Sequence, residues 1–63
     1  MDRLCIYPKD VQVVTGRSER YGRDLIRKIK ETLAKKDHQF VTVEEFCNYT
    51  GLSIHAVKSM LRS

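Results

Sequence analysis

Basic side chains are concentrated in one segment of the sequence. Residues 17–36 include eight lysines and arginines and three acidic residues, whereas the rest of the chain has four basic and five acidic residues. Positive charge gathered in one segment is typical of a surface that binds phosphate groups. Arginine can also form paired hydrogen bonds with the edge of a guanine in the major groove. The candidate residues in this segment are Arg17, Arg20, Arg23, Arg27 and Lys30.

The sequence lacks the residue patterns that support catalysis or metal binding. Cys5 and Cys47 form no Cys-x-x-Cys pair, and His38 and His55 lie at no metal-ligand spacing from them. Neither histidine has a nearby carboxylate pair or nucleophile pattern, and no glycine-rich phosphate loop occurs. We therefore expect a protein that is not an enzyme, with no catalytic residues, no metal site and no cofactor. Both thiols are expected to be buried and unreactive.

Helices are predicted to position the basic residues. Pro8 suits the first turn of a helix, and Gly16 can take the left-handed conformation that ends many helices. Ser18 is a favourable N-cap for the helix that follows. These signals predict helices over residues 8–14 and 19–35, after an N-terminal segment whose weak alternation fits a short extended arm or strand.

The longer of these predicted helices is amphipathic. Its apolar residues recur at steps of three and four, so they form one stripe. The stripe consists of Gly22, Leu25, Ile26, Ile29 and Leu33. At about 100° per residue, Arg20, Arg23, Arg27 and Lys30 lie on the opposite face. Burial of the apolar stripe is therefore expected to turn the basic residues toward solvent.

The second half of the chain carries equally clear helix signals. Thr42-Val43-Glu44-Glu45 is a capping box, in which the Glu45 side chain reaches back to the N–H of Thr42. Two further helices are predicted over residues 43–49 and 54–62, with Gly51 between them. The predicted core consists of Val11, Val14, Leu25, Ile29, Leu33, Phe46, Val57 and Leu61. A domain of 63 residues buries a core of only modest size.

The chain overlays on itself when it is shifted by 35 residues. Thr15-Gly16-x-Ser18 falls on Thr50-Gly51-x-Ser53, and Asp10-Val11 falls on Glu45-Phe46. Each half thus has a short helix, a Thr-Gly turn and a serine-capped helix. We expect a single all-α domain over residues 1–63, built from four helices. Its parts are a first hairpin (8–35), a linker (36–41) and a second hairpin (42–63).

Apolar and small residues stand at fixed distances from Gly51. They are Phe46 and Cys47 before the glycine, and Leu52, Val57 and Met60 after it, with Ser53 as a helix cap. This pattern, over residues 41–62, resembles the helix-turn-helix of small bacterial DNA-binding proteins, most closely excisionase-like regulators. Thr50 departs from it, because an aliphatic residue is more usual there. The first half, over residues 8–27, matches less well, because Gln12, Arg17 and Gly22 replace a small, an apolar and a branched residue.

The resemblance implies that the last predicted helix presents side chains to the major groove. The outward residues on that helix are His55, Lys58, Ser59 and Arg62. The expected function is binding of double-stranded DNA, as a small transcription regulator or recombination accessory factor. A larger protein partner or self-association would strengthen that binding. The alternative is a helical protein–protein interaction module with no direct role in nucleic-acid binding.

The expected location is the cytoplasm. No apolar run approaches the roughly 18 residues that a membrane-spanning helix needs. The first seven residues also lack the long apolar stretch of a signal peptide. We therefore expect no association with a membrane.

Overall fold

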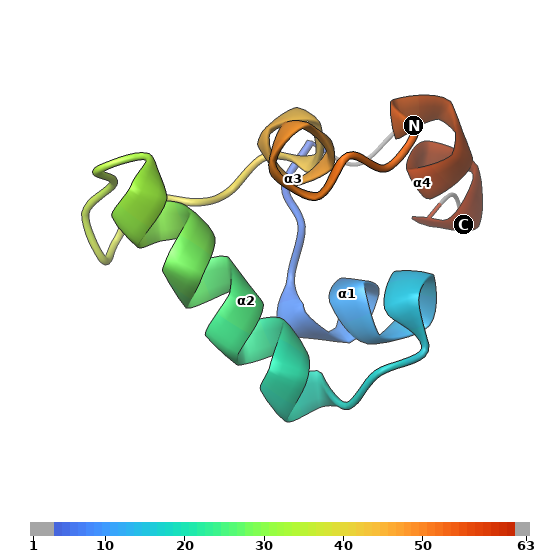
Figure 1. The fold of residues 1–63 in the computed structure, drawn as a ribbon, viewed down its shortest axis with the longest axis horizontal. Coiled ribbons are helices and arrows are strands. Elements are labelled where there is room, and N and C mark those ends of the chain that lie inside the picture. Colours follow the sequence, from blue (N-terminus) through green and yellow to red (C-terminus); the bar gives the residue numbers. More distant parts are fainter. Residues whose placement is uncertain (1–3, 62–63) are drawn as a thin grey trace.

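Four helices make up the computed structural model, which describes residues 4–61 (Figure 1). They are α1 (Pro8–Thr15), α2 (Glu19–Thr32), α3 (Val43–Thr50) and α4 (Ile54–Leu61). Each helix packs against the next one along the chain, and α1 also packs against α4, so the helices form a closed ring around the core. The predicted all-α, four-helix domain with two hairpins is confirmed.

A glycine in the left-handed conformation ends the first helix of each hairpin. Gly16 has φ 73° and ψ 12°, and Gly51 has φ 81° and ψ 9°. The N–H of Gly16 donates to the carbonyl oxygen of Gln12 at 2.9 Å, and that of Gly51 donates to Cys47 at 2.8 Å. The two donors are 35 residues apart, and so are the two acceptors. The same hydrogen bond therefore closes both turns.

The helix caps repeat in the same way. Ser18 accepts a hydrogen bond from the N–H of Tyr21 at 3.1 Å, and Ser53 accepts one from Ala56 at 3.4 Å. Both serines therefore cap the second helix of their hairpin, as the sequence predicts.

The start of each hairpin uses a carboxylate that reaches back along the chain. The N–H of Tyr7 donates to the Asp10 carboxylate at 2.8 Å, and that of Thr42 donates to Glu45 at 2.9 Å. The predicted capping box at Thr42 is confirmed, and Asp10 provides the equivalent bond at α1. The 35-residue repeat thus extends from the start of the first helix of each hairpin to the cap of the second.

The segment before α1 pairs with the segment before α3. Cys5 and Thr42 form an isolated antiparallel bridge, and the N–H of Ile6 donates to the carbonyl oxygen of Val41 at 3.0 Å. Ile6 and Val41 are themselves equivalent in the repeat, and both are almost fully buried. The predicted N-terminal arm is therefore a short extended segment that joins the two halves through matching residues.

Helix α2 ends three residues earlier than the sequence predicts. Ala34 has φ 56°, a left-handed conformation that no other non-glycine residue between 4 and 61 adopts. Its N–H donates to Glu31 at 3.2 Å, and the N–H of Lys35 donates to Lys30 at 2.8 Å. This is a Schellman motif, which commonly has glycine at the left-handed position. The prediction to residue 35 was wrong because alanine gives no sequence signal for such an ending.

The core differs from the prediction where extended segments contribute to it. The buried hydrophobic residues are Ile6, Val11, Ile26, Ile29, Val41, Val43, Phe46, Cys47, Val57 and Leu61. Val14 and Leu25 are only partly buried, and Leu33 is 44% exposed because it follows the end of α2. Ile6 and Val41 were missed because they lie outside the helices, where no helical periodicity marks them.

The linker between the hairpins is held by polar contacts. The ammonium of Lys30 donates to the carbonyl oxygen of Asp37 at 3.0 Å, and Lys35 forms an ion pair with Glu45 at 3.1 Å. Phe40 is 61% exposed and its ring lies edge-on to Tyr7, with 6.2 Å between centroids. These contacts attach the linker to α2, to α3 and to the N-terminal segment.

Candidate nucleic-acid interface

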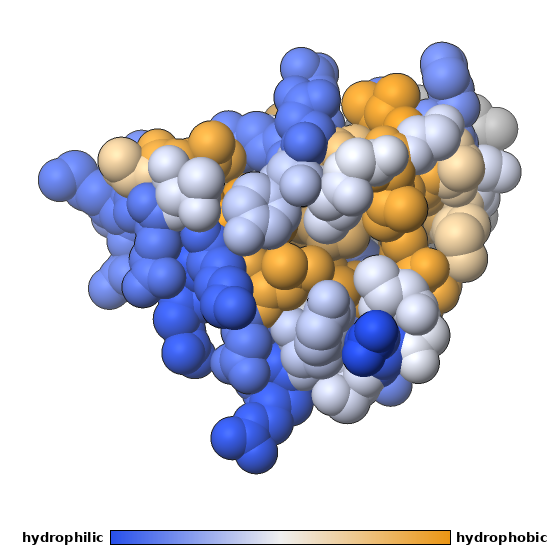
Figure 2. Space-filling view, in the orientation of Figure 1, coloured by the Kyte–Doolittle hydropathy of each residue, from blue (hydrophilic) through white to orange (hydrophobic). Residues whose placement is uncertain are grey.

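The outward face of α2 carries exposed arginines. Ile26 and Ile29 are buried on the inner side of this helix, whereas Arg20, Arg23 and Arg27 are exposed on the other. Figure 2 shows strongly hydrophilic residues gathered over the side of the molecule that α2 forms. The structure thus brings these three predicted residues together on one surface, which we call the α2 arginine face.

Two of these arginines form ion pairs within α2. Arg23 lies 3.8 Å from Glu19, and Arg27 lies 3.6 Å from Asp24. The arginine side chains are 58% and 71% exposed. Exposed ion pairs of this kind contribute only about 0.2–1 kcal/mol, so a phosphate group can compete for either arginine. The carboxylates orient the arginines without removing them from solvent.

The other two predicted basic residues of this segment have different surroundings. The Arg17 guanidinium lies over the Tyr21 ring, 5.1 Å from its centroid, so it stays at the start of α2. The half-buried Lys30 side chain instead donates to the backbone of Asp37. Lys30 therefore holds the linker, and Arg17 packs on Tyr21 beside the start of α2.

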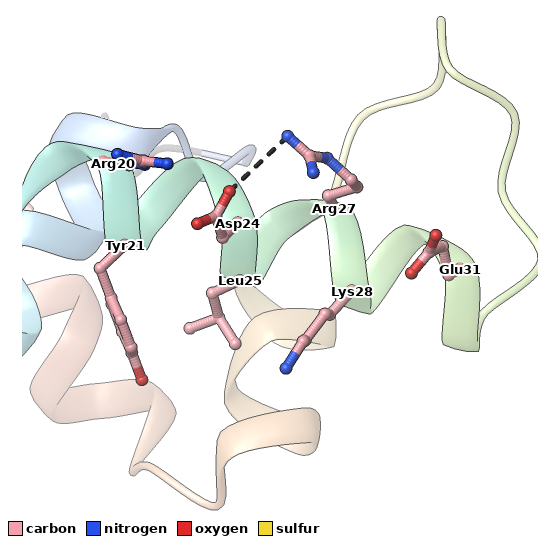
Figure 3. Close-up of a pocket in the computed structure, with 7 residues that line it drawn as sticks. All are labelled: Arg20, Tyr21, Asp24, Leu25, Arg27, Lys28 and Glu31. Atoms are coloured by element: carbon pink, nitrogen blue, oxygen red, sulfur yellow. Dashed lines mark ion pairs between the residues drawn. The ribbon is translucent and has the colours of Figure 1, made fainter.

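A shallow depression of about 610 Å³ runs along the flank of α2 (Figure 3). It is lined by Arg20, Tyr21, Asp24, Leu25, Arg27, Lys28 and Glu31. Figure 3 shows Tyr21, Leu25 and Lys28 extending to one side of α2, and Arg20 and Arg27 lying on the other. All of the lining residues belong to one helix, so the depression is part of its outer surface. Lys28, which was not among the predicted site residues, is exposed and lines the same depression from the side opposite Arg20 and Arg27.

The predicted groove face of α4 is less uniform. His55 and Ser59 are exposed, but Lys58 is half-buried. Lys58 lines a second depression, of about 290 Å³, together with Glu44 and Glu45 of α3. The remaining predicted residue, Arg62, lies outside the described residues. The structure therefore confirms an outward position for two of the four predicted side chains.

The two predicted faces are equivalent surfaces of the repeat. The shift of 35 residues places Arg20 on His55 and Arg23 on Lys58. It also places Asp24 on Ser59 and Arg27 on Arg62. The sequence contains this correspondence, which becomes visible when the candidate residues of one half are compared with those of the other.

The two thiols have different surroundings. Cys47 is buried in the core, and this burial raises the pKa of its thiol. Its predicted burial is confirmed, and the raised pKa disfavours the reactive thiolate. Cys5 is only half-buried, since it lies on the segment that pairs with Thr42. Across residues 4–61, no three His, Cys, Asp or Glu side chains are grouped closely enough to hold a metal ion.

Comparisons with known proteins add no family assignment. Neither protein-family models nor curated proteins nor solved structures gave a match to this chain. Within the described part of the chain, none of the helices combines the length and apolar character that crossing a bilayer requires. The proposals that follow therefore rest on the residues and their geometry.

Proposed function

We propose that this protein binds double-stranded DNA through its helix-turn-helix-like hairpins, as a small regulator or recombination accessory factor in the cytoplasm. The observation that carries the proposal is the α2 arginine face. Arg20, Arg23 and Arg27 share one exposed side of a helix whose opposite side is buried. The role as regulator or accessory factor rests on the resemblance of residues 41–62 to excisionase-like proteins.

The dimensions of the α2 arginine face suit a nucleic-acid backbone. Arg20 and Arg27 are separated by roughly 10 Å along the helix axis, at about 1.5 Å per residue. Each DNA strand carries one negative charge per roughly 3.4 Å of duplex axis. The arginines can therefore contact more than one phosphate at the same time. Arginine is also well suited to phosphate because its planar guanidinium offers paired N–H donors.

Titration with duplex DNA at several salt concentrations tests the proposal. Each phosphate contact contributes roughly 0.9 to the slope of log affinity against log salt. We expect Arg23→Ala/Arg27→Ala to weaken binding and to lower that slope by up to about two. The fold should survive, because both side chains are exposed and alanine favours a helix. Amide chemical shifts of the free variant check the fold directly.

A matched control removes the same amount of charge elsewhere. Lys9 and Lys36 are exposed and lie outside α2, so Lys9→Ala/Lys36→Ala lowers the net charge equally. This control should retain most of the affinity for duplex DNA. Equal losses in both double variants would mean that only the net charge matters. Unchanged affinity in the arginine variant would exclude the α2 arginine face and favour His55, Lys58, Ser59 and Arg62 instead.

A second candidate function is suggested by apolar side chains at the surface. Leu4, Val13, Phe40 and Met60 are each more than half exposed. Side chains of this kind can contact a protein partner or a second copy of the chain. In that case, this protein is an interaction module without a direct nucleic-acid role. Absence of duplex binding at low salt would favour this function over the first.

A further inference from the structure

We propose that α2 is the helix that enters the major groove, where Arg20 and Arg23 contact guanine edges, and that α4 stays outside the groove. This inference rests on the proposed DNA-binding function. It assigns the recognition role to the first hairpin, although the second hairpin has the stronger sequence resemblance to a helix-turn-helix. The ligand is duplex DNA whose site contains guanines.

The size of the molecule allows only one of its two equivalent helices to occupy a groove. Its longest dimension is 28 Å. Paired helix-turn-helix units that enter successive major grooves on one side of DNA are about 34–36 Å apart. A single major groove is about 12 Å wide and admits one helix. Helices α2 and α4 therefore compete for the recognition role, and one of them must lie elsewhere.

The charges of equivalent residues favour α2. Arg20, whose guanidinium is always charged, corresponds to His55, which has no such group. Arg23 is exposed, whereas its equivalent Lys58 is half-buried and shares a depression with acidic residues of α3. At both positions the first hairpin presents a permanent, accessible positive charge, and the second hairpin does not.

Acidic residues also make the second hairpin a poorer phosphate ligand. Glu44 and Glu45 lie in the first turn of α3, and both line the depression that contains Lys58. At the equivalent place in α1, Asp10 is buried and accepts a hydrogen bond from the Tyr7 backbone. A DNA backbone that approaches α4 therefore meets the exposed carboxylate of Glu44, and beside it the half-buried Glu45 that is paired with Lys35.

Arg20 and Arg23 are placed where a recognition helix contacts bases. Both belong to the first five residues of α2, and base contacts in helix-turn-helix proteins come from the N-terminal part of the recognition helix. Within residues 4–61, Arg20 forms no ion pair, and the Glu19 side chain that pairs with Arg23 is 42% exposed. Arg27 lies a turn further along and is assigned to phosphate contact.

Replacement of a single ring atom in DNA tests this assignment. A short duplex is first selected by the wild-type chain from a randomised pool, and its guanines are then replaced by 7-deazaguanine. This base retains pairing but lacks the N7 acceptor that arginine contacts in the major groove. We expect wild-type affinity to fall about tenfold, as removal of part of a paired contact predicts.

Variants at repeat-equivalent positions show which helix makes the contact. Arg20→Ala/Arg23→Ala should bind more weakly and should no longer distinguish guanine from 7-deazaguanine. His55→Ala/Lys58→Ala should still lose about tenfold on the substituted duplex. Arg20→Lys/Arg23→Lys retains the charge and N–H donors that can still reach N7 but loses the planar paired fork, so it should keep salt-dependent binding and show a smaller distinction than wild type. The lysine variant separates a lost contact from a damaged fold.

Three results would overturn the inference. Loss of guanine discrimination in His55→Ala/Lys58→Ala, with retention in Arg20→Ala/Arg23→Ala, would assign the groove to α4. Wild-type binding that is equal on both duplexes would exclude guanine contacts through N7 while leaving DNA binding intact. Absence of any wild-type binding to duplex DNA would instead remove the proposed function itself.

Discussion

The two hairpins share their turns and caps but differ at the point where their helices meet. The turn glycines, the cap serines and the carboxylates at the helix starts all recur at an offset of 35 residues. Four residues after the cap serine there is a buried position, which is Gly22 in α2 and Val57 in α4. A Cβ atom at Gly22 would lie 2.6 Å from the carbonyl oxygen of Pro8.

This difference shows which features local chemistry determines and which depend on side-chain volume. Hydrogen bonds at a turn need only a few neighbouring residues, so both hairpins retain them. The approach of two helices depends on the atoms between them. Glycine allows the backbone of α2 to lie directly against the start of α1, and α4 must accommodate a branched side chain. Equivalent local motifs can therefore support different packing.

The largest expected effect is in the second hairpin, at Phe46. This residue is fully buried, and its equivalent in the first hairpin is the smaller Val11, which is also fully buried. We expect Phe46→Ala to lower the free energy of unfolding by about 3–5 kcal/mol, because the lost ring leaves a cavity. Denaturant titration measures this change.

The control is the chain's other phenylalanine. Phe40 is mostly exposed, so Phe40→Ala should cost no more than the edge contact with Tyr7, about 0.5–1.5 kcal/mol. Similar losses at Phe46 and Phe40 would contradict the difference in burial between these two side chains.

A smaller effect is expected at the glycine that distinguishes the hairpins. In an open helix, Gly22→Ala would stabilise by about 0.8–1 kcal/mol. Here the added methyl group meets backbone atoms of Pro8, and such overpacking costs about 1–3 kcal/mol. We therefore expect a net loss of up to about 2 kcal/mol, measured by thermal or denaturant unfolding.

At Val57, the equivalent position in α4, a smaller side chain should lower stability, whereas at Gly22 a larger one should lower it. Val57→Ala removes buried carbon atoms, so shortening should destabilise α4, at about 0.8 kcal/mol per methylene before any cavity term. A stabilised Gly22→Ala variant would show that the two hairpins pack alike.

The end of α2 offers a change that should stabilise the protein. Ala34 occupies a left-handed position, whereas both turn glycines have no strain of this kind. The left-handed conformation costs roughly 1–2 kcal/mol for a residue with a Cβ atom. We expect Ala34→Gly to raise the free energy of unfolding by about 0.5–1 kcal/mol, since glycine also increases the entropy of the unfolded chain. No gain, or a loss, in chemical denaturation would contradict the strained ending.

The smallest predicted effect concerns the pH dependence of the capping box at α3. The hydrogen bond from the Thr42 backbone, together with Lys35, lowers the pKa of Glu45 below its ordinary value of 4.5. A lowered pKa stabilises the fold above the unfolded value, and this stabilisation is lost as pH falls through the folded value. Glu45→Gln should therefore reduce stability at pH 7 by about 0.3–1 kcal/mol.

The difference between wild type and Glu45→Gln should decrease in acid. Chemical denaturation at pH 7, 5 and 3 measures it, and the difference should shrink as pH falls, because protonation of Glu45 makes it resemble the uncharged glutamine. A difference that stays constant over this range would mean that Glu45 acts through packing and not through its charge.

Local signals in the sequence were sufficient to predict most helix boundaries and both turns. Gly16 and Gly51, the serine caps and the Glu45 capping box all act on residues within four positions along the chain. Such short-range chemistry is visible in the sequence, and so is the alternation of apolar and basic residues along α2. The repeat and the α2 arginine face follow directly from these patterns.

Only the tertiary structure decided which of these residues are available at the surface and which are buried. Ile6 and Val41 enter the core because two distant extended segments pair, and Lys58 is half-buried because it meets α3. Lys30 turns to the linker, and Ala34 ends α2 without glycine. Each of these outcomes depends on the three-dimensional arrangement of the chain, and helical periodicity carries no information about it.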